Sequence, residues 1–233
     1  MEKWCIYYCY PGLPFIFKDR ADALKALNGK FGQMLLDRAG QYGLVGLGYM
    51  ENGIRQITSN KCPIVKPSDL DGVKLRTMQV QAHMEAFQLM GANPTPMSFN
   101  EVYSALQQGV VDAEENPLGH ITSSKFYEVQ KCMTLTSHVY STHIVLANPD
   151  FYNSLSDADK DLVKQSLATA IDYQQQVIAN EEEQQIKDIE AAGVTVTRLT
   201  PEQRNEFEKV TAPIREKYLS EADPELIKAL NER

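Results

Sequence analysis

The sequence has little basic charge, and it has neither a long apolar run nor a cysteine motif. Its 233 residues carry 23 Lys and Arg against 31 Asp and Glu, a formal net charge of −8. This balance disfavours a nucleic-acid partner and an anionic membrane surface, both of which select basic patches. No stretch of about 18 apolar residues occurs, so we expect no membrane-spanning helix.

The four cysteines and four histidines do not form a recognisable metal site. Their spacing matches neither a C-x-x-C pair nor a zinc motif, and we expect incidental or buried thiols rather than disulfides. For the histidines we expect structural roles, and we expect no metal and no cofactor. The residues concerned are Cys5, Cys9, Cys62, Cys132, His83, His120, His138 and His143.

Catalytic motifs are also absent. The chain has no G-x-S-x-G, no H-E-x-x-H, no phosphate-binding loop and no dinucleotide fingerprint. Glu114 and Glu115 are adjacent carboxylates, but neighbours on a strand point to opposite faces and cannot act on one bond together. A small α/β enzyme, a hydrolase or isomerase with one of them as base, stays an alternative without a supporting nucleophile.

Short strands alternate with helices along the chain, which indicates an α/β fold. Strands at 73–75 and 110–111 run directly into Arg76 and Asn116, and ligands of open α/β sheets bind beyond the carboxyl ends of strands. Upstream, Asn52-Gly53 is a strong turn signal between two predicted strands. From periodicity alone, Arg55 and Arg76 are surface ion-pair residues.

The stretch from Ser156 to Ala192 contains no proline or glycine, and Gly193 follows it. It predicts one helix of about 54 Å at 1.5 Å per residue, longer than one domain of this size. Its apolar positions form two patches separated by residues 179–185. We expect a solvated face at 181–183 and a helix that packs on two lobes and crosses between them.

Several ordered motifs carry a family resemblance from about Gly12 to Tyr218. The chain resembles the DctP-type extracytoplasmic solute receptors of TRAP (tripartite ATP-independent periplasmic) transporters. The matching text is Asn52-Gly53-Ile54-Arg55, Gly72-Val73-Lys74-Leu75-Arg76, residues 91–103 from Gly91 to Tyr103, residues 105–117 from Ala105 to Pro117, and Lys125-Phe126-Tyr127-Glu128.

The resemblance implies an α/β, periplasmic-binding-protein-like fold with two lobes and a long bridging helix. Residues 1–52 and 141–180 would form the first lobe, and residues 53–140 and 181–233 the second. Family members carry a further N-terminal stretch before the part that matches Leu13, and this chain shows no signal peptide. We therefore expect a first lobe that lacks its N-terminal strands.

The resemblance also implies the binding residues. Arg76 matches the arginine that pairs with a ligand carboxylate, because a guanidinium fork fits a carboxylate in a bidentate manner. Asn116 matches the asparagine that hydrogen-bonds the same carboxylate, and Arg55 matches a second arginine of sialic acid-type receptors. Phe99 matches an aromatic residue that lines the pocket, and Tyr140 is a weaker candidate near the crossing strands.

The implied function is that of a non-enzymatic, periplasmic substrate-binding component. It would bind a small organic acid (a dicarboxylate, sialic acid or other sugar acid) and deliver it to a membrane permease, as a monomer without a nucleic-acid partner. The alternative is a truncated remnant of such a receptor that binds nothing. Glu114 departs from the family, which commonly has Gly-Gln where this chain has Ala113-Glu114, and an inward charge there would weaken anion binding.

Overall fold

A computed structural model describes residues 10–233. Cys5, Cys9 and the N-terminal stretch in which we sought a signal peptide lie outside these residues. The described part of the chain forms one six-stranded mixed sheet in the order β3-β2-β4-β1-β5-β6. The strands are β1 Val45–Ser59, β2 Lys74–Thr77, β3 Asn93–Pro96, β4 Ala113–Pro117, β5 Cys132–Ala147 and β6 Thr195–Arg198.

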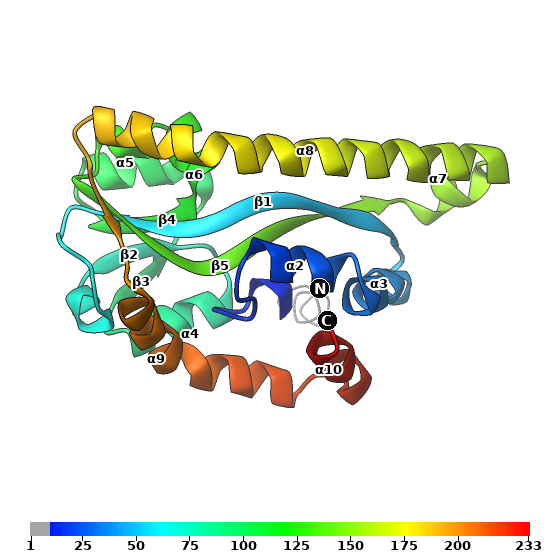
Figure 1. Cartoon of the computed structure of the whole chain (residues 1–233), viewed down its shortest axis with the longest axis horizontal. Coiled ribbons are helices and arrows are strands. Elements are labelled where there is room, and N and C mark those ends of the chain that lie inside the picture. The colour runs from blue at the N-terminus through cyan, green and yellow to red at the C-terminus, as the bar shows by residue number, and fades with distance from the viewer. Residues whose placement is uncertain (1–9) are drawn as a thin grey trace.

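Two long strands organise this sheet. β1 has 15 residues and β5 has 16, and they pair antiparallel from Val45↔Ala147 to Ser59↔Cys132. Figure 1 shows them as a continuous ribbon that runs from the left half of the molecule, where β2, β3 and β4 lie, to the right half beside α2 and α3. The ribbon thus joins the two halves without a flexible linker.

The predicted turn at Asn52-Gly53 is wrong, because β1 continues through it. The register with β5 shifts between Glu51 and Gly53, which is the signature of a β-bulge. Gly53 has φ 116°, a value that favours glycine, and a Cβ added there would approach Pro117 Cβ to 2.9 Å. Asn-Gly therefore forms a bulge inside a strand here, rather than a hairpin.

The strands around the expected site are also displaced from their predicted positions. β4 begins at Ala113, whereas Val110 is 53% exposed and lies in the preceding turn. β3 was missed because its four residues, Asn-Pro-Thr-Pro, include two prolines. Proline is tolerated at a sheet edge, where its missing N–H leaves no ladder bond unmade, and β3 is an edge strand parallel to β2.

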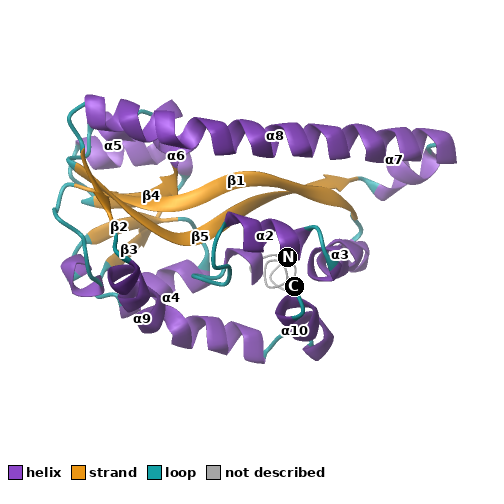
Figure 2. Cartoon of the chain, in the orientation of Figure 1, coloured by secondary structure: helices purple, strands orange, loops and turns teal. Residues whose placement is uncertain are grey.

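Helices cover both faces of the sheet (Figure 2). Several begin after a residue whose side chain accepts from a backbone N–H of the first turn, such as Asp19 and Thr200. The helices are α2 Arg20–Leu27, α3 Lys30–Asp37, α4 Gln81–Leu89, α5 Val102–Gln107, α6 Leu118–Ser123, α7 Pro149–Ser154, α8 Asp157–Ala191, α9 Pro201–Ser220 and α10 Pro224–Asn231. No helix within residues 10–233 is both long and apolar enough to span a membrane.

The long helix is confirmed. α8 begins after the cap residue Ser156 and runs for 35 residues along the crossing strands (Figure 1). The side chain of its Gln174 makes two hydrogen bonds with the backbone of Glu51. Oε1 accepts from the Glu51 N–H at 3.1 Å, and Nε2 donates to the Glu51 carbonyl at 2.6 Å. The expectation of a wholly solvated face at 181–183 is wrong for Glu182, since Arg20 of α2 donates to both of its carboxylate oxygens.

The buried apolar residues fall into one cluster in the right half of the molecule and two in the left half. The right-hand cluster joins α2 and α3 to the ends of β1 and β5. It also includes Leu226 and Leu230 of α10, because α10 presents an apolar face to α3.

A disulfide between Cys62 and Cys132 corrects the expectation of free thiols. The two residues are 70 positions apart in the sequence, and the register of β1 with β5 brings Cys132 opposite Ser59. Sequence spacing could not indicate this pairing, because it depends on strand register.

Replacing Cys62 and Cys132 together by serine is expected to lower the free energy of unfolding by at least about 2 kcal/mol, because the closed loop no longer restricts the unfolded chain. Denaturant unfolding followed by circular dichroism measures this change. Reduced wild-type protein should show the same loss. Equal stability of oxidised and reduced wild type would show that the disulfide does not contribute.

Candidate functional site

The candidate site lies where β2 and β4 end side by side. The two strands are parallel and pair Arg76 with Glu114. Two residues later β4 carries Asn116, and the 3-10 turn Phe99–Glu101 brings Phe99 toward the same edge. Arg76 Cζ lies 6.0 Å from the centre of the Phe99 ring. Of the predicted site residues, the structure thus places Arg76 beside Phe99, and places Asn116 two residues beyond the strand partner of Arg76.

Arg76 is buried and only partly paired. Its exposed fraction is 3%, so the expectation of a surface ion-pair residue, drawn from periodicity, is wrong. Nε and Nη2 both donate to the Met97 carbonyl, at 3.3 and 2.9 Å, and Nη1 has no partner among the described residues. Burial lowers the pKa of Arg76, and the charges of Glu115 and Glu114 offset this only in part. An anion that accepts from Nη1 would remove the cost of this unpaired donor.

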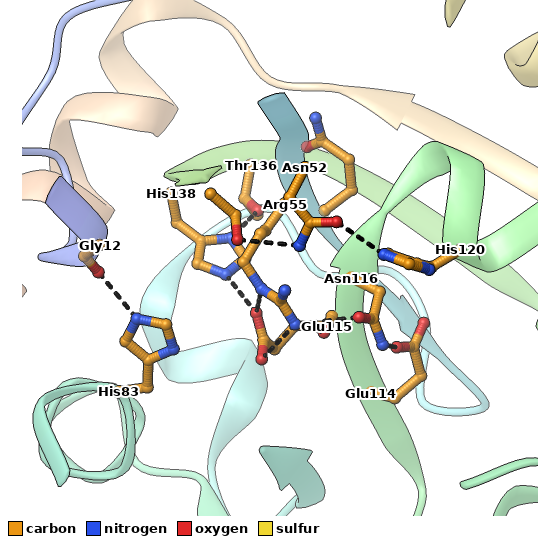
Figure 3. A network of polar contacts seen from close by, with 12 residues as sticks. Gly12, Asn52, Arg55, His83, Glu114, Glu115, Asn116, His120, Thr136 and His138 are labelled. Carbon is orange, nitrogen blue, oxygen red and sulfur yellow. Dashed lines mark hydrogen bonds and ion pairs between the residues drawn. The ribbon is translucent and has the colours of Figure 1, made fainter. Parts of the chain in front are cut away.

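Arg55 is held within the protein, 1% exposed. Nε donates to Oε2 of Glu115, and Nη2 donates to Glu115 Oε1 at 2.9 Å and to Asn116 Oδ1 at 3.1 Å. His138 extends the chain, because its Nε2 donates to Glu115 Oε2 at 3.1 Å while Nδ1 accepts from Thr136. Figure 3 shows these groups in one continuous network. Arg55 therefore fixes the position of the Asn116 side chain through the hydrogen bond to its Oδ1 atom.

The other side of Asn116 is held by Glu114. Asn116 Nδ2 donates to Glu114 Oε2 at 2.5 Å, and the Thr58 hydroxyl donates to Glu114 Oε1 at 2.8 Å. The two adjacent glutamates share no hydrogen-bond donor residue, in agreement with opposite faces of one strand. The amide of Asn116 is thus fixed by a carboxylate on one side and a guanidinium on the other (Figure 3).

These two buried carboxylates have opposite pKa shifts. Burial raises the pKa of Glu114 to about 7, although its bonds from Asn116 and Thr58 oppose the shift. Burial also favours the neutral form of Glu115, but the charge of Arg55 and the bonds from His138 and Arg55 outweigh it and lower the pKa of Glu115. Glu115 is consequently ionised at neutral pH, while Glu114 titrates there.

Tyr140 lies apart from the Arg76 group. It pairs with Ile54 in the ribbon and packs edge to face on Phe17, with ring centres 6.2 Å apart. Burial and the adjacent charge of Glu51, which also accepts a hydrogen bond from the phenol, raise the pKa of Tyr140. It belongs to the right-hand cluster of buried apolar residues.

A second polar group, which sequence reasoning missed, surrounds Asn52. Its Oδ1 accepts from Nε2 of His120 at 2.7 Å and from Nε2 of His143 at 2.9 Å, while Nδ2 donates to Ser141 at 3.0 Å. His120 also contacts the Phe99 ring, with centres 5.5 Å apart. The Asn-Gly signal could have drawn attention to Asn52, but the histidines come from distant segments. Within residues 10–233 no cluster of three or more His, Cys, Asp or Glu side chains could hold a metal ion.

Comparison with known proteins shows what the chain is similar to. The model of the family "Bacterial extracellular solute-binding protein, family 7" (DctP) matches residues 7–221. The 2,3-diketo-L-gulonate-binding periplasmic protein YiaO of Escherichia coli is 39% identical over 184 residues, 79% of this chain and 56% of the relative. The chain therefore spans little more than half the length of this relative.

Solved structures agree with this result and with the predicted two-lobe α/β fold. A TRAP periplasmic solute-binding protein from Polaromonas sp. JS666, bound to D-erythronate, superposes with a TM-score of 0.91 at 36% identity, covering 98% of this chain and 75% of that one. A second, from Shewanella oneidensis with bound succinate, gives 0.91 at 29% identity with the same coverages. The chain belongs to the DctP family of bacterial extracellular solute-binding proteins.

Proposed function

We propose that this chain binds a small organic acid as the substrate-binding component of a TRAP-type transporter and passes it to a membrane permease. The observation that carries the proposal is the buried Arg76 guanidinium, whose Nη1 lacks an acceptor beside Asn116 and Phe99. A carboxylate is the group that this donor geometry suits best. The acids named for the similar proteins, D-erythronate and succinate, support the same class of ligand.

Each residue has a separate role in this proposal. Arg76 supplies the charge-assisted hydrogen bond to the carboxylate, and Asn116 orients that carboxylate with the free hydrogen of its amide. Arg55 and Glu115 act as positioning residues, because their bonds fix Asn116 and leave Arg55 without exposure. The half-exposed ring of Phe99 lines the apolar side of the ligand. No residue here is given a catalytic role, in keeping with a family of solute-binding proteins.

Replacing Arg76 by alanine is expected to weaken binding of the best organic acid by about 30-fold or more, since truncation of one partner of a buried charge pair costs about 2–5 kcal/mol. Isothermal titration of D-erythronate, succinate and D-galactonate against both proteins measures it. Arg76→Lys should recover only part of the affinity, because an ammonium lacks the planar fork.

The matched control is Arg198→Ala, which removes an exposed arginine that pairs with Glu190 on the surface. It should leave affinity unchanged. Equal affinity of wild type and Arg76→Ala for the best acid would remove Arg76 from the proposed site. Failure of every acid to bind to the folded wild-type chain would favour the alternative of a remnant that binds nothing.

A further inference from the structure

A cavity of about 290 Å³ with both polar and apolar walls lies under α8. Its walls come from β1, α6, β5 and α8, and the residues used below are Asn52, His120, His143, Glu51, Glu181 and Glu182. The cavity is open to solvent and is lined by segments from distant parts of the sequence. Gln174 and Glu182 anchor α8 to β1 and α2, so this wall has a fixed position.

The cavity adjoins the Arg76 site through one aromatic ring. Phe99 contacts the Arg76 guanidinium on one side and the His120 ring on the other, at 6.0 and 5.5 Å between centres. His120 is itself a wall of the cavity. Arg76, Phe99 and His120 therefore form a series of contacts that leads from the candidate site to the wall of the cavity.

The hydrogen-bond arrangement of this wall suits hydroxyl groups. Because Asn52 Oδ1 accepts from Nε2 of both histidines, each ring carries a hydrogen on Nε2, and a neutral His120 ring keeps Nδ1 as an acceptor. Burial, with the charges of Arg55 and His143, lowers the pKa of His120, so this ring is neutral at pH 7. Hydroxyls can donate to the imidazole nitrogens and to carboxylate oxygens, and can also accept.

The charge of the wall disfavours a second anionic group. Glu51, Glu181 and Glu182 all line the cavity, and Arg20 pairs with only two of them, Glu51 and Glu182. A second ligand carboxylate placed here would face like charge at short range, which costs affinity and excludes such ligands. A neutral polar chain meets no such penalty.

We infer that this cavity is a subsite for the polyhydroxylated chain of the ligand, so that the protein selects sugar acids with one carboxylate over dicarboxylates. The inference rests on the proposed function, since it takes the Arg76 end of the ligand as given. It assigns Asn52, His120 and His143 as specificity-determining residues.

The test is titration of the full chain with four acids: D-galactonate, D-erythronate, succinate and hexanoate. Wild type is expected to bind D-galactonate at least tenfold more tightly than hexanoate, which has the same chain length without hydroxyls, and more tightly than succinate. His120→Ala and His143→Ala should each lower the affinity for D-galactonate about tenfold and change the affinity for hexanoate less than twofold. Circular dichroism melting of each variant separates loss of binding from loss of folding.

A second control is Lys187→Ala on the exposed side of α8, which should change no affinity. Unchanged D-galactonate affinity in both histidine variants, with binding still lost in Arg76→Ala, would overturn the subsite and leave the proposed function intact. Preference of wild type for succinate would also overturn it. Absence of binding for all four acids would overturn the proposed function together with the subsite.

Discussion

Replacement of Arg55 by methionine is expected to lower the free energy of unfolding by about 4 kcal/mol. The substitution keeps most of the side-chain length but leaves Glu115 fully buried without its main counter-charge. Breaking a buried ion pair from one side costs about 3–5 kcal/mol, because the remaining charge has lost both water and partner. His138 can compensate only in part, since it donates a single bond to Glu115.

A double-mutant cycle with Glu115→Gln measures the coupling directly. Each single variant should be strongly destabilised, and the double variant should lose clearly less than the sum of the two, because neither charge then remains buried alone. Urea unfolding with an unchanged m-value ensures that the comparison concerns the folded state.

Arg198→Met is the matched control for this cycle. Arg198 makes its ion pairs with Glu183 and Glu190 at the surface, with about half of its side chain exposed. Exposed pairs contribute at most about 1 kcal/mol. Additive effects of Arg55→Met and Glu115→Gln would show that the buried pair is not a coupled unit.

The sequence indicated the local elements of this fold better than their assembly. The long α8 was predicted as one helix, because its cap and its freedom from proline and glycine are local properties of the sequence. The continuity of β1 through Asn52-Gly53 was missed, because a bulge and a turn use the same residues. Only the pairing with β5 distinguishes them.

The candidate site residues that the sequence indicated were those that lie within family motifs. Arg76, Asn116 and Phe99 came from the family resemblance, and their proximity follows from the parallel pairing of β2 and β4. The engagement of Arg55 by Glu115 could not be predicted, since the two residues are 60 positions apart and meet only through the register of β1 with β4. The hydrogen bonds from His120 and His143 to Asn52 could not be predicted either, because these residues are also far apart in the sequence.

Glu114→Gln is expected to become more stable than wild type as pH rises from 4.5 to 7, because it removes a carboxyl group whose pKa burial raises to about 7. The folded-state pKa of Glu114 is about 7, above its ordinary value of 4.5. Between these values the folded protein keeps a proton on Glu114 that the unfolded chain has released, so the contribution of Glu114 to stability falls as pH rises from 4.5 to 7 and then levels off. Glutamine can donate to Thr58 and still accept from Asn116, as the protonated acid does.

The variant should therefore match wild type at pH 4 and exceed it by up to about 3 kcal/mol at pH 8. Urea unfolding at a series of pH values measures both curves. Glu216→Gln, at an exposed position of α9, should follow wild type throughout. A Glu114→Gln curve with the same slope as wild type would assign the pH dependence to other groups.

The same substitution bears on ligand binding, because ionised Glu114 adds like charge near Arg76, where the ligand carboxylate is proposed to bind. At pH 8, Glu114→Gln should bind the best organic acid about tenfold more tightly than wild type, or ~1.4 kcal/mol. At pH 5.5, where Glu114 is protonated in wild type, the two proteins should bind equally. Weaker binding by the variant at pH 8 would mean that the Glu114 carboxylate instead holds Asn116 in the orientation that the ligand requires.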